Sequence, residues 1–319
     1  MEFDENTLSL TEQELEKVQN LIRKTRQAPQ VDFFNRERTK ELFIPVDGGE
    51  IRCFHHAPSS PEGVRPVVFL TGWGTIPDGF GDFFSAVNDR AECYYLETRE
   101  KNSSRIQRSG ADFSMDQQAR DIQHAIDHLG LAGKDFALIG TCWGSTMIAH
   151  GLARGIIDAP TIVLFDPMYA LWFPKWILNI IAPITPNWFW TAVRPIAKRI
   201  ATFGMKERTQ RRRLESFIDS ATVWKWKRTA LQARDENLYK LAGDIRQEVF
   251  VLNGVQDHIH DNTHYPRLAR LMPKGRFFYM QADESQREFL LGMTVVEFAK
   301  TRAEDGLPAV FRDFEKKIR

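Results

Sequence analysis

Short apolar runs alternate with helical patterns along most of the chain. Runs rich in Val, Ile, Leu, Phe and Tyr predict strands at Lys40–Val46, Ile51–His55, Pro66–Leu70, Glu92–Leu96, Asp135–Ile139, Thr161–Phe165, Val249–Leu252 and Arg276–Met280. The first two flank an Asp-Gly-Gly turn and predict a hairpin. The later runs lack polar–apolar alternation, which is typical of parallel strands buried on both faces. Helical periodicity separates them, most clearly at Met115–Leu131, so the pattern predicts a doubly wound α/β domain.

Two segments depart from this rhythm. Thr11 and Glu14 form a capping-box pattern that predicts an amphipathic helix to about Gln27. Between the runs ending at Phe165 and starting at Val249, only helical patterns occur. We therefore expect three parts, with the cap over the carboxyl edge of the sheet. They are an N-terminal helical segment (1–30), an α/β core (31–167 and 246–319) and an inserted helical cap (168–245).

Composition narrows the class of protein. The 319 residues are 43% hydrophobic and 27% charged, and the net charge of +1 argues against a basic nucleic-acid binder. Three cysteines, Cys53, Cys93 and Cys142, make no disulfide framework and fit a reducing compartment. Because the N-terminus lacks a secretory pattern and no apolar stretch is long enough to span a bilayer, we expect a cytoplasmic protein.

The sharpest motif is Gly140-Thr141-Cys142-Trp143-Gly144, which follows the strand pattern DFALIG and precedes a helical pattern. Glycines on both sides of a nucleophile at a strand-to-helix turn are the signature of a nucleophile elbow. The turn is strained, so its close neighbours must be small. It presents the side chain at a helix N-terminus, where the dipole favours a cysteine thiolate.

Together with the run VVFLTGWG, this elbow resembles the α/β-hydrolase superfamily. The resemblance spans about residues 40–300 and implies an α/β-hydrolase fold, a mostly parallel sheet with flanking helices and an inserted helical cap. It implies that the backbone N–H groups of Trp73 and Trp143 form an oxyanion hole. It places the acid at Asp257, in the segment VFVLNGVQDHIHD, with Asp166 as its rival. A cysteine in the elbow is most similar to polyhydroxyalkanoate synthases and dienelactone hydrolases.

One departure from the superfamily pattern affects the chemistry. Its triad histidine follows the last strand, and that register places Gln286 there, with no histidine after His264. A glutamine cannot serve as general base near neutral pH, so the Ser-His-Asp cycle fails as written. Three interpretations remain open. Another group supplies the base (Glu284, Asp283, His258 or His260), the helix dipole makes the thiolate without one, or the site is inactive and binds a ligand.

The predicted cap has an unusual composition. Trp172, Trp176, Trp188 and Trp190 lie close together, and the stretch Leu171–Arg213 carries nine basic residues and one acidic residue. Apolar and aromatic residues beside basic ones suit peripheral membrane contact or a pocket for an acyl chain. The alternative is a cap whose apolar face packs on the sheet beneath a solvated basic rim.

Other polar residues favour simpler interpretations. The cluster formed by Asp257, His258, His260, Asp261 and His264 matches no standard zinc spacing, so we predict neither metal nor cofactor. Arg99, Glu100, Lys101 and Ser103 follow a predicted strand, and either line the pocket or form a polar surface loop. The leading hypothesis is acyl chemistry on a lipophilic ester or thioester, with Cys142 as nucleophile. The alternative is an inactive relative that binds a small ligand, a membrane surface or a protein; no nucleic acid is expected, and the oligomeric state is open.

Overall fold

The computed structural model describes residues 8–27, 33–35, 37–77, 80–171, 173–203, 208–255, 262–282 and 286–318. The strands are β1 (Thr39–Val46), β2 (Gly49–His56), β3 (Val67–Leu70), β4 (Cys93–Leu96), β5 (Arg105–Ile106), β6 (Ala137–Thr141), β7 (Thr161–Phe165), β8 (Val249–Val255), β9 (Gly275–Ala282) and β10 (Glu315–Lys316). The helices of the core are α1 (Glu12–Arg26), α2 (Gly81–Val87), α3 (Met115–His128), α4 (Trp143–Ala153), α10 (His264–Leu271) and α11 (Arg287–Lys300). Short 3₁₀ helices η6 (Ala303–Asp305) and η7 (Ala309–Phe314) follow α11.

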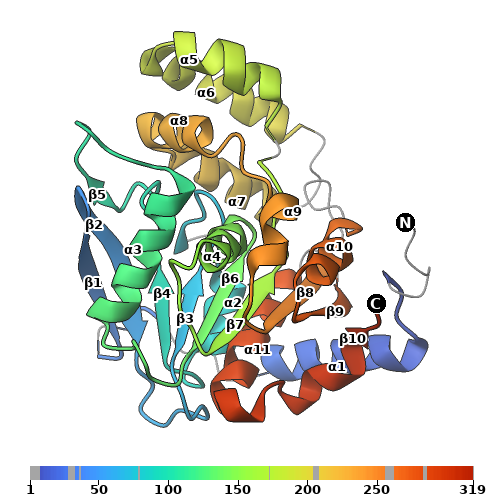
Figure 1. Ribbon diagram of the computed structural model, residues 1–319. Coiled ribbons are helices and arrows are strands. Elements are labelled where there is room, and N and C mark those ends of the chain that lie inside the picture. Colours follow the sequence, from blue (N-terminus) through green and yellow to red (C-terminus); the bar gives the residue numbers. More distant parts are fainter. Residues whose placement is uncertain are drawn as a thin grey trace.

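The strands form one sheet in the order β1-β2-β4-β3-β6-β7-β8-β9-β10 (Figure 1), with β5 paired to β2. Within this order, β4, β3, β6, β7, β8 and β9 run parallel to one another. Strands β1 and β2 form the predicted antiparallel hairpin. Parallel strands end at one common edge, so the loops after β3, β6, β7, β8 and β9 meet there. The predicted doubly wound α/β class is confirmed.

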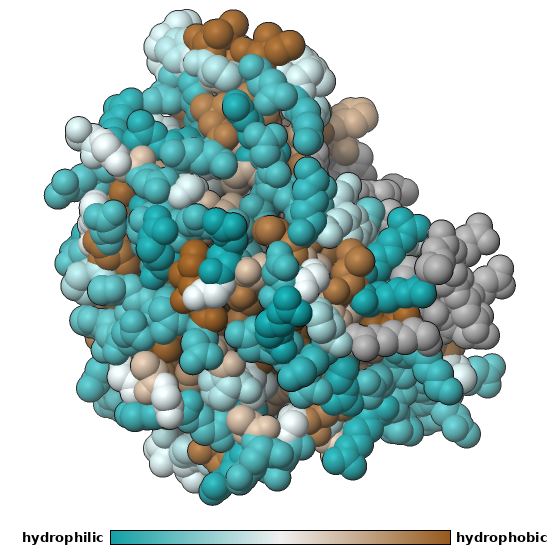
Figure 2. All heavy atoms as spheres, viewed as in Figure 1, coloured by the Kyte–Doolittle hydropathy of each residue, from teal (hydrophilic) through white to brown (hydrophobic). Residues whose placement is uncertain are grey.

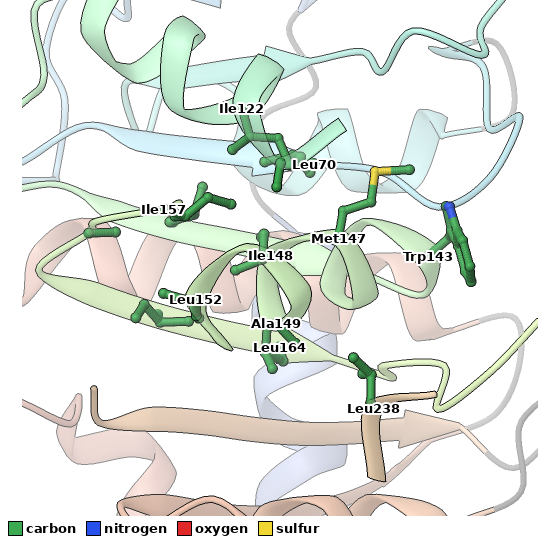
Figure 3. Packing of buried hydrophobic residues seen from close by; sticks show 14 of the residues in the cluster. Leu70, Ile122, Trp143, Met147, Ile148, Ala149, Leu152, Ile157, Leu164 and Leu238 are labelled. Carbon is green, nitrogen blue, oxygen red and sulfur yellow. The ribbon is translucent and has the colours of Figure 1, made fainter. Parts of the chain in front are cut away.

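Both faces of the sheet are buried, which explains why the strand runs lack alternation. Successive residues of β3 divide between two clusters, Val67 and Phe69 packing on one face and Val68 and Leu70 on the other. Helices α3, α4 and α10 cover one face, and α1, α2 and α11 cover the other (Figure 1). Figure 3 shows α4 packed on its strands through Ile148, Ala149 and Leu152, with Trp143 at the start of the helix.

Helices connect β7 to β8 and lie above the carboxyl edge of the sheet (Figure 1). They are η3 (Ile177–Ile181), α5 (Ala182–Ile184), α6 (Asn187–Ala201), α7 (Arg208–Asp219), α8 (Val223–Gln232), α9 (Leu238–Leu241) and η4 (Ala242–Asp244). We call this group the cap. Its outer layer, η3, α5 and α6, rests on α7 and α8, which face the core.

The capping box predicted at the N-terminus is present. The Thr11 hydroxyl accepts from the Glu14 N–H at 3.2 Å, and the Glu14 carboxylate accepts from the Thr11 N–H at 2.7 Å. Helix α1 then packs on α11 and β9 through Val18 and Ile22. Within the described ranges, no helix is long and apolar enough to cross a membrane.

The differences from the sequence prediction are small and local. Strand β6 begins two residues later than predicted, and the Asp135 side chain forms an ion pair with Arg65 just before it. The two-residue strands β5 and β10 were not predicted, since a stretch that short carries no measurable alternation.

Candidate active site

Cys142 lies at the tip of a sharp turn between β6 and α4. Its backbone has φ 53° and ψ −122°, a conformation that residues with a Cβ rarely adopt. The Cys142 N–H donates to the carbonyl of Phe165 on β7 at 2.9 Å, which fixes the turn to the neighbouring strand. A strained residue of this kind persists only where its surroundings over-determine it.

The two flanking glycines are required by close packing. A Cβ atom at Gly144 would lie 2.6 Å from the carbonyl oxygen of Thr71, and one at Gly140 would lie 2.7 Å from the Ser145 nitrogen. These neighbours are backbone atoms and cannot give way cheaply. The glycines therefore let α4 begin directly against the end of β3.

The loop after β3 faces the cysteine. A Cβ atom at Gly72 would lie 3.1 Å from Cys142 Cβ and 3.4 Å from its Sγ. Because the resemblance implies an oxyanion hole here, we call residues Thr71–Gly74 the oxyanion turn. Trp73 follows Gly72 in this turn, and Trp143 is the first residue of α4, whose N–H has no acceptor within its helix. The structure thus brings three of the predicted site residues, Cys142, Trp73 and Trp143, to one place.

A buried ion pair supports the oxyanion turn from behind. The ammonium of Lys101 lies 3.2 Å from the Glu100 carboxylate, and both side chains are fully buried. Lys101 Nζ donates to the carbonyl of Gly72, and Glu100 Oε1 accepts from the Gly74 N–H at 3.4 Å. The surface-loop alternative for this segment is therefore wrong for Arg99, Glu100 and Lys101. Because these three residues are all charged, the sequence here has no apolar pattern from which their burial could have been predicted.

The cap is hydrogen-bonded to the loop that carries this ion pair. Lys225 on α8 donates from Nζ to the carbonyl of Lys101 at 2.7 Å and to the carbonyl of Ser104. Burial lowers the pKa of Lys225 to about 8, against the opposing effect of Glu100. The cap is thereby bonded to the loop after β4, and Lys101 of that loop in turn donates to the Gly72 carbonyl in the oxyanion turn.

Aromatic rings surround the turn on the cap side. The ring of Trp73 meets those of Trp143, Phe173 and Trp226 edge-on, with centroids 5.6, 6.3 and 6.1 Å away. Within the described residues, the indole N–H groups of Trp73 and Trp143 are buried and have no acceptor. Four aromatic rings therefore lie together on the cap side of the oxyanion turn.

The acid and base side of the site looks different. Asp166 ends β7 with φ 48° and is fully buried. Arg287, the first residue of α11, donates from Nε to its carboxylate and from Nη2 to the Thr141 hydroxyl, each at 2.8 Å. Because Thr141 directly precedes Cys142, the start of α11 lies beside the elbow.

Gln286 is the N-cap residue of α11, next to Arg287. Its amide exchanges two hydrogen bonds with the amide of Gln19 on α1, at 3.1 and 3.3 Å. Asp257, His258, His260, Asp261, Asp283 and Glu284 lie outside the described residues. The predicted register therefore places Gln286 near the elbow, through Arg287, and joins its side chain to the N-terminal helix.

Comparison with known proteins agrees with the fold. Residues 65–285 match the family described as the alpha/beta hydrolase fold, which is well over half of the chain. The chain belongs to the α/β-hydrolase family. No curated protein sequence matches this chain significantly.

Solved structures share the fold at low sequence identity. An esterase from Exiguobacterium antarcticum is 17% identical with a TM-score of 0.64, covering 82% of this chain and 100% of the esterase. A hydrolase from Pseudomonas aeruginosa PA01 is 14% identical with a TM-score of 0.61, covering 82% and 99% of the two chains. An enol-lactonase from Burkholderia xenovorans LB400 is 16% identical with a TM-score of 0.60, covering 81% and 99%.

One buried histidine of this chain was not singled out by the sequence analysis. His150, near the end of α4, has Glu236 3.0 Å from Nδ1 and Asp116 2.7 Å from Nε2. Burial lowers its pKa, but hydrogen bonds to the two carboxylates outweigh this and raise the pKa overall.

His264 packs against the ring of Tyr169 and bonds to the Tyr239 hydroxyl. Over the described ranges, no group of His, Cys, Asp and Glu is arranged to hold a metal.

Proposed function

We propose that the protein performs acyl chemistry on a lipophilic ester or thioester, with Cys142 as the nucleophile. The observation that carries the proposal is the backbone of Cys142, strained at φ 53° and held against Gly72. That conformation costs free energy and orients a side chain toward the oxyanion turn, which a structural cysteine does not need. Cys53 and Cys93, by contrast, lie fully buried in ordinary strand positions.

The reaction proposed for this site has two steps. The Cys142 thiolate attacks the substrate carbonyl carbon, and the oxyanion accepts hydrogen bonds from the N–H groups of Trp73 and Trp143. The carbon–oxygen or carbon–sulfur bond then breaks, and the leaving group takes a proton. Water or another acceptor removes the acyl group from the cysteine. The aromatic rings around Trp73 favour a substrate with an apolar acyl group.

The identity of the proton carrier is the second part of the proposal. Asp166 is committed to its ion pair with Arg287, which favours Asp257 as the acid-loop carboxylate. The Gln286 amide is committed to Gln19. We therefore assign proton transfer to the loops after β8 and β9, with His258 and Glu284 as candidates. Separate His258→Gln, His260→Gln and Glu284→Gln variants test this, since removing the base changes the pH–rate profile and not only its height.

The decisive experiment is to trap the acyl-enzyme. Wild type is incubated with p-nitrophenyl and coenzyme A esters from acetyl to palmitoyl, and the intact mass is measured while turnover is followed. We expect an acyl adduct on Cys142 and, in Cys142→Ala, turnover reduced at least about a thousandfold. An unchanged rate in Cys142→Ala with an unchanged melting temperature would overturn the assignment.

One observation favours a second candidate function, ligand binding without turnover. Gln286 stands where the base is expected and its side chain bonds to α1 as a structural residue does. Binding of a long-chain acyl ligand, measured by quenching of tryptophan fluorescence, with no turnover at any chain length would favour this function.

A further inference from the structure

The outer layer of the cap turns apolar side chains toward solvent. On η3 and α5 the residues Trp176, Ile180 and Ile184 are 60, 60 and 76% exposed. On α6 and just after it, Trp188, Ile196, Ile200 and Phe203 are 71, 60, 71 and 87% exposed. We call these seven residues the cap face. Figure 2 shows apolar spheres gathered over α5 at the outermost edge of the cap.

Helix periodicity shows that this exposure belongs to whole faces. Trp176, Ile180 and Ile184 are spaced four apart, and so are Ile196 and Ile200. The opposite sides of the helices already have partners, since Leu178 and Ala182 are buried and α6 packs on α7 and α8. The alternative in which the apolar side of the cap simply packs on the sheet does not describe these residues. A solvent-facing helix of this chain looks different, because α3 exposes His124, Asp127 and His128.

The charge around the cap face has one sign. No Asp or Glu occurs from Pro167 to Lys206, whereas five basic residues do: Lys175, Arg194, Lys198, Arg199 and Lys206. Lys175 and Arg199 are exposed beside the apolar residues. The Lys198 ammonium donates to the Asp219 carboxylate. The Arg194 guanidinium donates to the backbone carbonyls of Asp219 and Ala221. An apolar strip with tryptophans beside the exposed Lys175 and Arg199 matches the boundary between acyl chains and anionic head groups.

We propose that the cap face docks on the surface of an anionic phospholipid bilayer. Trp176, Trp188 and the isoleucines enter the head-group boundary, and Lys175 and Arg199 contact lipid phosphates. A second copy of the chain is a poorer occupant, because a symmetric contact would place the two basic rims together. The cap's inner layer touches the oxyanion turn through Trp226, so the cap would lie between the lipid surface and the elbow. The proposal stands whether or not Cys142 turns over a substrate.

The test is flotation of the full-length protein with vesicles of phosphatidylcholine alone or mixed with phosphatidylglycerol. We expect binding to the anionic vesicles that weakens as salt is raised. Ile184→Ser with Trp188→Ser should weaken it at least about tenfold, because each residue loses the transfer of a large apolar side chain. Lys175→Glu with Arg199→Glu should weaken binding to anionic vesicles by a similar factor and leave binding to neutral vesicles unchanged.

Matched controls separate docking from folding. Val64→Ser removes an apolar side chain that is also 60% exposed but lies before β3, at the other end of the sheet, and should bind like wild type. The cap-face residues are exposed, so all variants should keep the wild-type melting temperature. Equal flotation of wild type and the Ile184→Ser, Trp188→Ser variant would overturn the proposal. So would a wild-type dimer that this variant converts to monomer without any vesicle binding.

Discussion

The two halves of the site are built in different ways. On the side of β3, β4 and β6, backbone and glycines shape an elbow and an oxyanion turn, supported by the buried Glu100–Lys101 pair. On the side of β7 and β9, two polar side chains that the structure describes are paired with other residues, Asp166 with Arg287 and Gln286 with Gln19. In the proposed mechanism the first half polarises the substrate carbonyl, whereas the described pairs of the second half join elements at the same edge of the sheet.

The largest effect on this comparison should come from Lys101. Lys101→Met leaves the Glu100 carboxylate buried without its partner and removes the donor to the Gly72 carbonyl. We expect a loss of about 3–5 kcal/mol in the free energy of unfolding, measured by urea titration. The double variant with Glu100→Gln should recover part of it. A loss below about 1 kcal/mol would show that the ion pair does not support the turn.

The next effect concerns the far end of α4. His150→Gln removes a cation held between Asp116 and Glu236 and should cost about 1.5–3 kcal/mol at pH 6. The folded-state pKa of His150 is raised above its ordinary 6.5, so the stabilisation is present below pH 6.5 and is lost as pH rises through the folded pKa. The gap between wild type and variant in thermal unfolding should therefore narrow above pH 6.5. A gap that widens with pH would contradict the charged-histidine account.

The elbow glycine should show a smaller but specific effect. Gly144→Ala forces a Cβ to within 2.6 Å of a backbone carbonyl. We expect the free energy of unfolding to fall by about 1–3 kcal/mol. The yield of acyl-enzyme should fall as well, because the turn that presents Cys142 is disturbed. Gly243→Ala is the matched control, since a Cβ there meets nothing within 4 Å and should change stability by less than about 0.5 kcal/mol. Equal effects of the two variants would remove the steric argument.

The smallest effect is expected at Gln286, and it sharpens the comparison most. Gln286→His should lose the amide pair with Gln19 and cost about 1 kcal/mol in chemical denaturation. Turnover should stay within about threefold of the wild-type rate, because a general base must lie within hydrogen-bond reach of the proton that it removes. Gln19→Ala provides the control for the lost pair. A rate increase of about a hundredfold or more in Gln286→His would show that this half of the site retains a base position.

Sequence could predict what depends on pattern. Buried strand runs, the hairpin around Gly48 and the elbow glycines follow from local rules that the backbone must obey, and the structure has them. The catalytic assignment of Cys142, Trp73, Trp143 and Asp257 remains a prediction. So does the division of the chain into core and cap, although helices do fill the segment between β7 and β8.

What sequence missed depends on distant partners. Nothing local marks Lys101 as buried, because its environment comes from Gly72 and from Lys225 on the cap. The pairing of Arg287 with Asp166 joins residues 121 positions apart in the chain. Periodicity revealed apolar stripes on the cap helices, but a stripe alone does not say which side faces inward. The exposure of Trp188 and Ile184 required the packed structure.

The most direct test of the central claim is the rate of Cys142 alkylation by iodoacetamide across pH, followed by mass spectrometry of the labelled peptide. Cys53 and Cys93 are fully buried and serve as internal controls that should stay unlabelled. The account predicts that the labelling rate reaches half its maximum at a pH below ~8.5, the pKa of a free thiol, because the elbow presents Cys142 at a helix N-terminus. A half-maximum at or above that value, or no labelling of Cys142 in the folded protein, would contradict it.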